Sequence, residues 1–114
     1  MKPQNFIISE YPIFFSPTLA KVYGVNEAII LQKIHIFLES ENSGVEYRKH
    51  KWIYNSYAEW LKMMPFLTKD IIAKALRGLE NRGVLKSCQP FKNRWDRRKA
   101  YRIIYEKIDI DCAK

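Results

Sequence analysis

The chain has 114 residues, of which 47% are hydrophobic and 14% aromatic, enough for one folded core but too short for two. A largely disordered chain is excluded, and no apolar run reaches the roughly 18 residues that cross a bilayer. The formal net charge of +8 favours a polyanionic partner, either nucleic acid or an anionic membrane surface. Since the first residues contain no continuous apolar segment typical of a secretory signal, we expect a cytoplasmic protein that does not bind membranes.

The N-terminal segment is apolar and β-prone over residues 6–15, but Pro12 interrupts it. Because proline is excluded from a central strand, we expect an extended arm over about residues 1–15. This arm would pack on the domain or on a second copy of it.

Two helices are predicted next. Ser16 and Pro17 form an N-cap and a first helical residue, and Gly24 ends that helix. Asn26 is predicted to cap the next helix, over residues 26–39, with Val25 and Ile30 forming a hydrophobic staple. Its main apolar stripe is Ile30, Leu31, Ile34, Phe37 and Leu38, with Ile29 and Ile36 on the far side. Such a helix needs cover on both sides, so the sequence favours a homodimer through the arm and helix 26–39.

A polar, acidic turn over residues 39–44 precedes a predicted short strand at 52–55. Ser56 and Glu59 then have the spacing of a capping box, which opens a helix with Trp60, Leu61 and Met64 on its inner face. The helix should end before Pro65. Phe66 and Leu67 are expected to fill the angle between this helix and the next.

The next helix is predicted over about residues 68–82, with Thr68 as its N-cap and Gly83 after its end. Its apolar arc, which we expect to be buried, contains Ile71, Ile72, Ala75, Leu76 and Leu79. The opposite arc is polar and mostly cationic, with Lys69, Asp70, Ala73, Lys74, Arg77 and Asn81. This composition suits a DNA groove, although an ordinary solvated helix face has the same composition.

Two strands, over residues 84–89 and 100–105, flank a basic loop at about 90–99. Tyr101, Ile103 and Tyr105 are predicted to share one face of the second strand. Such a loop is poor core material but can reach along a phosphate backbone. We therefore predict an α+β fold: a winged helix-turn-helix, mostly helical, with a small antiparallel sheet and a basic β-hairpin wing. Residues 1–107 form this single domain, and residues 108–114 a C-terminal tail.

Two resemblances are carried by these residues. The spacing of Leu67, Thr68, Ile71, Ile72, Ala75, Leu76, Leu79 and residues 83–85 resembles winged-helix DNA-binding domains of bacterial regulators. Residues 12–13, 19–20, 24–35, 52–60, 66–68 and 101–103 resemble winged-helix proteins of phages, plasmids and integrative elements, often described as replication proteins or replisome organisers. The resemblance implies double-stranded DNA binding, in replication initiation or transcriptional regulation of a mobile genetic element.

The DNA-contacting residues predicted from these patterns lie on the helix and the wing. They are Thr68, Lys69, Asp70, Ala73, Lys74, Arg77, Lys92, Arg94, Arg97, Arg98, Lys99 and Arg102. Lys69 or Arg77 would read guanine, because these side chains can contact both acceptors on its major-groove edge. Lys74 would contact phosphate. The wing cations would position the protein on the backbone or place one arginine in the minor groove.

The alternative is a winged-helix adaptor that docks on a replication or regulatory protein through the apolar arm and helix 26–39. An enzyme is not expected, since no Gly-rich phosphate loop, paired carboxylates or nucleophile–base pair is evident. No cofactor or metal is expected either, because the two cysteines, Cys88 and Cys112, have no CxxC spacing and no clustered histidines. His35 is interpreted as a histidine at the edge of the core.

Overall fold

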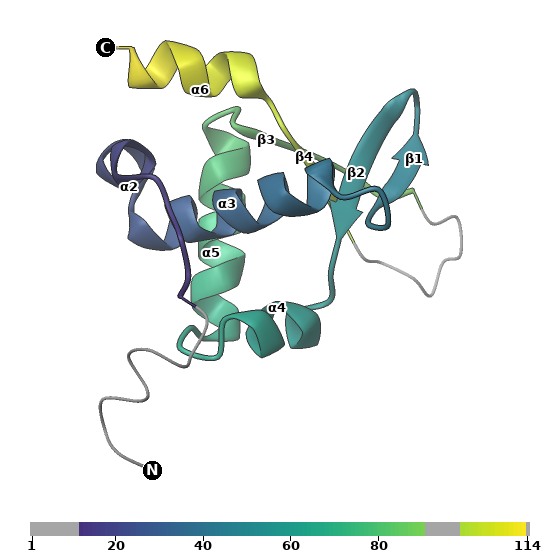
Figure 1. The fold of residues 1–114 in the computed structure, drawn as a ribbon, viewed down its shortest axis with the longest axis horizontal. Coiled ribbons are helices and arrows are strands. Elements are labelled where there is room, and N and C mark those ends of the chain that lie inside the picture. The colour runs from purple at the N-terminus through teal and green to yellow at the C-terminus, as the bar shows by residue number, and fades with distance from the viewer. Residues whose placement is uncertain (1–11, 91–98, 114) are drawn as a thin grey trace.

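Helices and an antiparallel sheet alternate along the chain in the computed structural model, which describes residues 12–90 and 99–113 (Figure 1). The elements are α2 (Pro17–Tyr23), α3 (Val25–Glu39), β1 (Val45–Tyr47), β2 (His50–Tyr54), α4 (Tyr57–Met63), α5 (Lys69–Asn81), β3 (Leu85–Cys88), β4 (Ala100–Ile103) and α6 (Tyr105–Cys112). The predicted α+β class is confirmed. Most of the predicted arm, residues 1–11, lies outside the described residues, and residues 12–15 belong to no helix or strand.

Helix α2 begins and ends where the sequence predicts. The Ser16 hydroxyl accepts a hydrogen bond from the Leu19 amide at 3.3 Å, and Pro17 follows as the first helical residue. The predicted start of α3 is wrong by one residue. Gly24 takes the N-cap position with a φ of 112°, so the helix begins at Val25 and Asn26 lies in its first turn. The predicted staple is also wrong, because Val25 is 52% exposed while Ile30 is fully buried.

Helix α3 crosses the domain and packs against α2, α5, β2 and β4. Ile29, Ile30, Leu31 and Ile34 are all buried in the hydrophobic core. The far-side position Ile29 is therefore covered by the described chain itself, whereas Ile36 remains 49% exposed. A homodimer through this helix stays a prediction.

The helix-turn-helix is built by local hydrogen bonds. The predicted capping box is present: the Ser56 hydroxyl accepts from the Glu59 amide at 3.2 Å, and the Glu59 carboxylate accepts from the Ser56 amide at 3.0 Å. Helix α4 ends before Pro65, and its Trp60 side chain is 1% exposed. Two residues were expected to fill the angle between the helices. Leu67 is buried there, whereas Phe66 is 55% exposed, so the prediction for Phe66 is wrong.

Helix α5 is also closed by the predicted residues. The Thr68 hydroxyl accepts from the Ile71 amide at 3.2 Å. At the other end Gly83 has a φ of 79°, and the Gly83 and Val84 amides donate to the carbonyls of Glu80 and Leu79. This pair of bonds is a Schellman motif, which requires a left-handed residue after the helix.

The buried arc of α5 differs from the prediction at one position. Ile72, Ala75, Leu76 and Leu79 are buried in the core as expected. Ile71 is 38% exposed, because it lies at the border of the arc and lines a cavity beside α3.

The sheet has the strand order β1-β2-β4-β3, and all pairs are antiparallel. The short strand predicted at 52–55 is confirmed as part of β2, which pairs with β4 so that Ile53 lies opposite Tyr101. Strand β1 was not predicted. A two-residue turn joins it to β2, with Arg48 and Lys49 at φ values of 52° and 68°. These positive angles are those of a type I′ hairpin turn.

The C-terminal segment is a helix rather than a strand end and a tail. Strand β4 stops at Ile103, and Tyr101 and Ile103 are both buried. The predicted place of Tyr105 on the same strand face is wrong, because Tyr105 begins α6. Tyr105 is 44% exposed, and its hydroxyl lies 2.8 Å from Nδ1 of the half-buried His35 on α3. This contact agrees with a histidine at the edge of the core.

A polar cluster holds α6 against the rest of the domain. Asp111 accepts hydrogen bonds from the Lys107 ammonium and from the Tyr23 hydroxyl, each at 2.8 Å. The Arg82 guanidinium lies 4.5 Å from the Tyr23 ring centroid and donates to the Val22 carbonyl at 3.0 Å. The hydrogen bonds from Lys107 and Tyr23 hold the pKa of Asp111 below its ordinary value, because they stabilise the carboxylate. The cluster therefore joins α2, the end of α5 and α6.

Candidate nucleic-acid interface

The outward face of α5 brings together the predicted helix residues. Thr68, Lys69, Asp70, Lys74 and Arg77 are exposed, and Ala73 is half-buried between them. Lys69 and Arg77 are eight positions apart, so they are separated by roughly 12 Å along the axis at about 1.5 Å per residue. A helix with its side chains is about 10–12 Å across, which fits the DNA major groove, about 12 Å wide.

Two residues on this face already have structural partners. The Thr68 hydroxyl is used as the N-cap of α5, so it is held against the Ile71 amide. The Lys69 ammonium lies 5.2 Å from the ring centroid of Tyr57 on α4, a cation–π contact between the two helices of the helix-turn-helix. Lys74 and Arg77 form no ion pair within the described ranges, and both are exposed, although Lys74 also lines the cavity beside α3.

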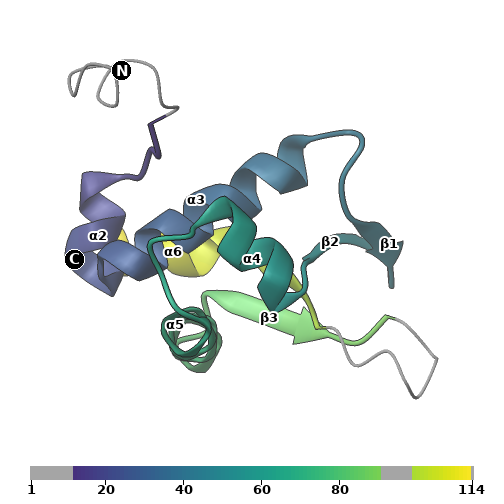
Figure 2. The same cartoon turned by 90° about the horizontal axis from the view of Figure 1, so that it is seen from below.

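Strand β3 lies beside α5 on one side of the molecule, while α3 lies on the other (Figure 2). Helix α5 packs against β3, and β3 pairs with β4. The exposed helix face and the hairpin formed by β3 and β4 are therefore neighbours in space as well as in sequence.

Only two of the predicted wing cations are among the described residues. Lys99 is exposed, and its ammonium lies 3.8 Å from a carboxylate oxygen of Glu80 on α5. The other Glu80 oxygen accepts from the Ser87 hydroxyl. Lys99 thus links the base of the hairpin to α5. Lys92, Arg94, Arg97 and Arg98 lie outside the described residues.

Arg102 occupies a different environment from a wing-tip cation. Its guanidinium lies 5.4 Å from the Trp52 ring centroid, on the sheet face that it shares with Lys86, its cross-strand partner. The Nε atom of Arg102 is buried without a hydrogen-bond partner in the described residues. Packing on Trp52 therefore accounts for much of the position of this side chain.

The sequence prediction missed a second basic hairpin. Arg48, Lys49 and His50 are exposed at the turn between β1 and β2, and the Arg48 guanidinium lies 5.1 Å from the Tyr47 ring centroid. Type I′ turns favour Asn-Gly or Asp-Gly, so an Arg-Lys turn carries no standard sequence signal. The strand order puts β1 at the opposite edge of the sheet from β3, so this hairpin is separate from the α5 face.

Burial is the largest cause of the pKa shifts outside the cluster at α6, with smaller contributions from charged neighbours such as Arg48 near Cys88 and Glu80 near Tyr101. Burial raises the pKa of the Cys88 thiol, and it raises the pKa of Tyr101 to about 12. Both groups are therefore uncharged near neutral pH. Among the described residues, no group of three or more His, Cys, Asp or Glu side chains could hold a metal ion.

The chain contains a helix-turn-helix that is followed by a pair of antiparallel strands. A third strand of the same sheet precedes the two helices in the chain. This is a winged-helix-like arrangement. Searches of protein-family models, curated proteins and solved structures find no match to this chain. Across residues 12–90 and 99–113, no helix is both long enough and apolar enough to cross a membrane.

Proposed function

We propose that the protein binds double-stranded DNA, with α5 in the major groove and the β3–β4 hairpin on the adjacent backbone. The observation that carries this proposal is the outward face of α5, where exposed Lys69, Lys74 and Arg77 follow one side of the second helix of a helix-turn-helix. In such motifs the second helix is the element that enters the groove.

The residues on α5 divide into different roles. Arg77 or Lys69 reads guanine, since both project from the part of the helix that faces outward. Lys74 contacts phosphate, and the predicted wing cations add sequence-independent affinity. The resemblance of the sequence to proteins of phages, plasmids and integrative elements supports a role in replication initiation or transcriptional regulation of such an element.

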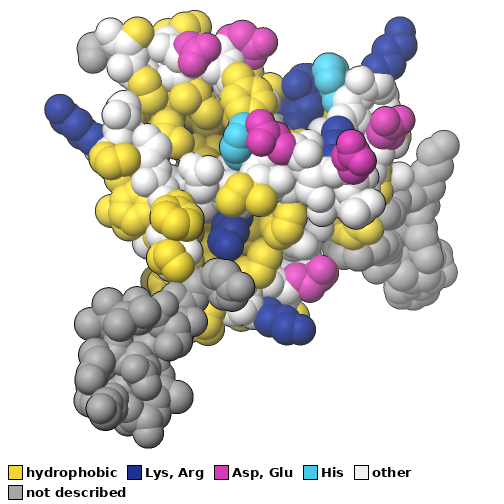
Figure 3. All heavy atoms as spheres, viewed as in Figure 1, with side chains coloured by type: hydrophobic (Ala, Val, Ile, Leu, Met, Phe, Trp, Pro, Cys, Tyr) yellow, Lys and Arg dark blue, Asp and Glu magenta, His cyan; other side chains and the backbone are white. Residues whose placement is uncertain are grey.

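A second candidate, a protein-interaction adaptor, is favoured by exposed apolar side chains. Phe14, Val25 and Phe66 are 71%, 52% and 55% exposed. On the face that carries α3, hydrophobic side chains gather on the side where α2 lies (Figure 3). An adaptor would bury such a surface against a replication or regulatory protein.

A selection from random duplex DNA at about 150 mM salt tests the proposal. The parent protein is compared with an Arg97→Ala/Arg98→Ala/Lys99→Ala variant. Enrichment of a motif by the parent, with affinity lowered almost uniformly in the variant, is expected for a helix that reads sequence and a wing that binds backbone. If the parent shows salt-sensitive binding but enriches no motif, sequence reading is excluded and the adaptor is favoured.

A further inference from the structure

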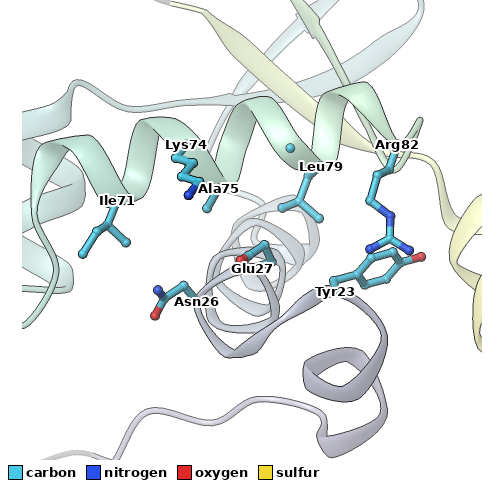
Figure 4. Close-up of a pocket in the computed structure, with 9 residues that line it drawn as sticks. Tyr23, Asn26, Glu27, Ile71, Lys74, Ala75, Leu79 and Arg82 are labelled. Carbon is cyan, nitrogen blue, oxygen red and sulfur yellow. The ribbon is translucent and has the colours of Figure 1, made fainter.

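A cavity lies between the flank of α5 and the junction of α2 with α3 (Figure 4). Its volume is about 390 Å³, which is within the range of small-molecule sites, roughly 300–1,000 Å³. It is lined by Tyr23, Asn26, Glu27, Ile71, Lys74, Ala75, Gly78, Leu79 and Arg82. The cavity is formed within one chain, so it needs no second subunit.

One wall of the cavity is apolar. Ile71, Ala75 and Leu79 point from α5 toward the first turn of α3, and the Tyr23 ring lies at one end (Figure 4). This placement explains why Ile71, predicted to be in the core, is 38% exposed. The wall suits the hydrocarbon part of a ligand.

Gly78 enlarges the cavity from within α5. Glycine weakens a helix interior relative to alanine, and Gly78 is not at a positive φ, so its backbone conformation does not require glycine. A Cβ atom at this position would meet nothing within 4 Å. The glycine therefore leaves space that an alanine or a larger residue would occupy.

Glu27 supplies the polar part of the cavity. Its Oε2 atom is buried and has no hydrogen-bond partner among the described residues. Both carboxylate oxygens lie 2.9 Å from the position that a Cβ of Gly24 would occupy, so a side chain at residue 24 would displace them. A buried carboxylate oxygen without a donor is costly, and a charged donor satisfies it best.

The neighbouring cations do not fill this role. Arg82 is held over the Tyr23 ring and donates to the Val22 carbonyl. Lys74 is exposed, and no ion pair joins it to Glu27 within the described residues. Among the described residues, no donor is therefore left for this oxygen.

We propose that this cavity binds a small organic ammonium ion, whose N–H group donates to Glu27 and whose apolar body lies along Ile71, Ala75 and Leu79. The proposal goes beyond DNA binding and does not depend on it. The apolar wall suits an alkyl or aryl group of a few carbons, and the Glu27 carboxylate suits the ammonium group, although the cations Lys74 and Arg82 also line the cavity.

Titration of the protein, labelled with ¹⁵N, with n-hexylamine tests the site by NMR. Saturable shifts are expected in amides at the start of α3 and along α5. The affinity for the neutral probe 1-hexanol should be lower by roughly tenfold or more, since hexanol lacks the charge. Equal binding of the two probes, or shifts located elsewhere, would overturn the proposal.

Variants locate the two halves of the site. Glu27→Gln keeps the size of the side chain and should weaken hexylamine binding roughly tenfold or more, whereas unchanged binding would overturn the role of Glu27. Gly78→Leu should block the cavity, while Asn81→Leu, an exposed position on the same helix, should not. Binding that appears only in a Lys74→Met variant would identify Lys74 as the partner of Glu27 and would also overturn the proposal.

Discussion

Replacing Lys74 and Arg77 one at a time should separate backbone binding from sequence reading. Both side chains are exposed on α5, and neither belongs to the hydrophobic core. Alanine at either position should change the free energy of unfolding by no more than about 0.5 kcal/mol. Any loss of DNA affinity can then be attributed to a lost contact.

The two variants should differ in the kind of loss. If Lys74 contacts one phosphate, Lys74→Ala lowers the slope of log K against log salt by about 0.9. Over a fourfold rise in salt, the parent then loses roughly three- to fourfold more affinity than the variant does. If Arg77 reads guanine, Arg77→Ala lowers affinity for the selected site roughly 5- to 150-fold, and discrimination against other bases at that position is relaxed.

Fluorescence anisotropy over a salt series, with the selected duplex and a scrambled duplex, measures both effects. Lys21→Ala is the control, because Lys21 is an exposed cation on α2. If Lys21→Ala lowers the salt slope as much as Lys74→Ala does, Lys74 is not a specific phosphate contact. If Arg77→Ala leaves the ratio of specific to scrambled binding unchanged, Arg77 does not read a base.

Three further predictions concern stability. Thr68→Ala should lower the free energy of unfolding by about 1 kcal/mol, because it removes the N-cap of α5. Thr68→Ser should retain most of this stabilisation, since serine also caps helices. Equal losses for the two variants in urea titrations would contradict the capping role. Gly78→Ala should raise the unfolding free energy by about 0.5–1 kcal/mol, since the new Cβ meets no atom within 4 Å; a lower melting temperature would show that the cavity is not open. The pKa of Asp111 is lowered in the folded protein, so its contribution is complete above the ordinary value of 3.8 and is lost as pH falls through the lower folded value. Urea titrations from about pH 5 to about pH 2 should therefore show a steeper loss of stability in the parent than in Asp111→Asn, and parallel curves would contradict the hydrogen bonds at α6.

The boundaries of α2, α4 and α5 could be predicted because their determinants are close in sequence. Ser16, Ser56 and Thr68 each accept a hydrogen bond from an amide three residues later. Gly83 ends α5 through its own positive φ. The apolar pattern of α5 was informative for the same reason, because helix geometry alone predicted five inner positions and four of them are buried. These signals require no knowledge of the partner elements.

The missed helix, α6, depends on residues that are far apart along the chain. Helix α6 is held by a bond between Tyr23 and Asp111, which are 88 positions apart, and by the contact of Tyr105 with His35, 70 positions apart. Its own amphipathic pattern is weak, so sequence periodicity could not distinguish it from a tail. The β1–β2 turn was missed for a different reason. Its two central positions, Arg48 and Lys49, contain no glycine or asparagine, so the turn has no standard sequence signal.

Local sequence signals specify the helix-turn-helix, the strands on either side of the basic loop and the cationic outer arc of α5, because caps, proline, glycine and periodicity act within a few residues. The fold of the whole chain is needed to show that Ile71 borders a cavity, that Glu27 has a buried oxygen without a partner among the described residues, and that α6 packs against α2. The burial of a side chain is set by whichever elements approach it. That approach is a property of the whole folded chain, and no local pattern encodes it.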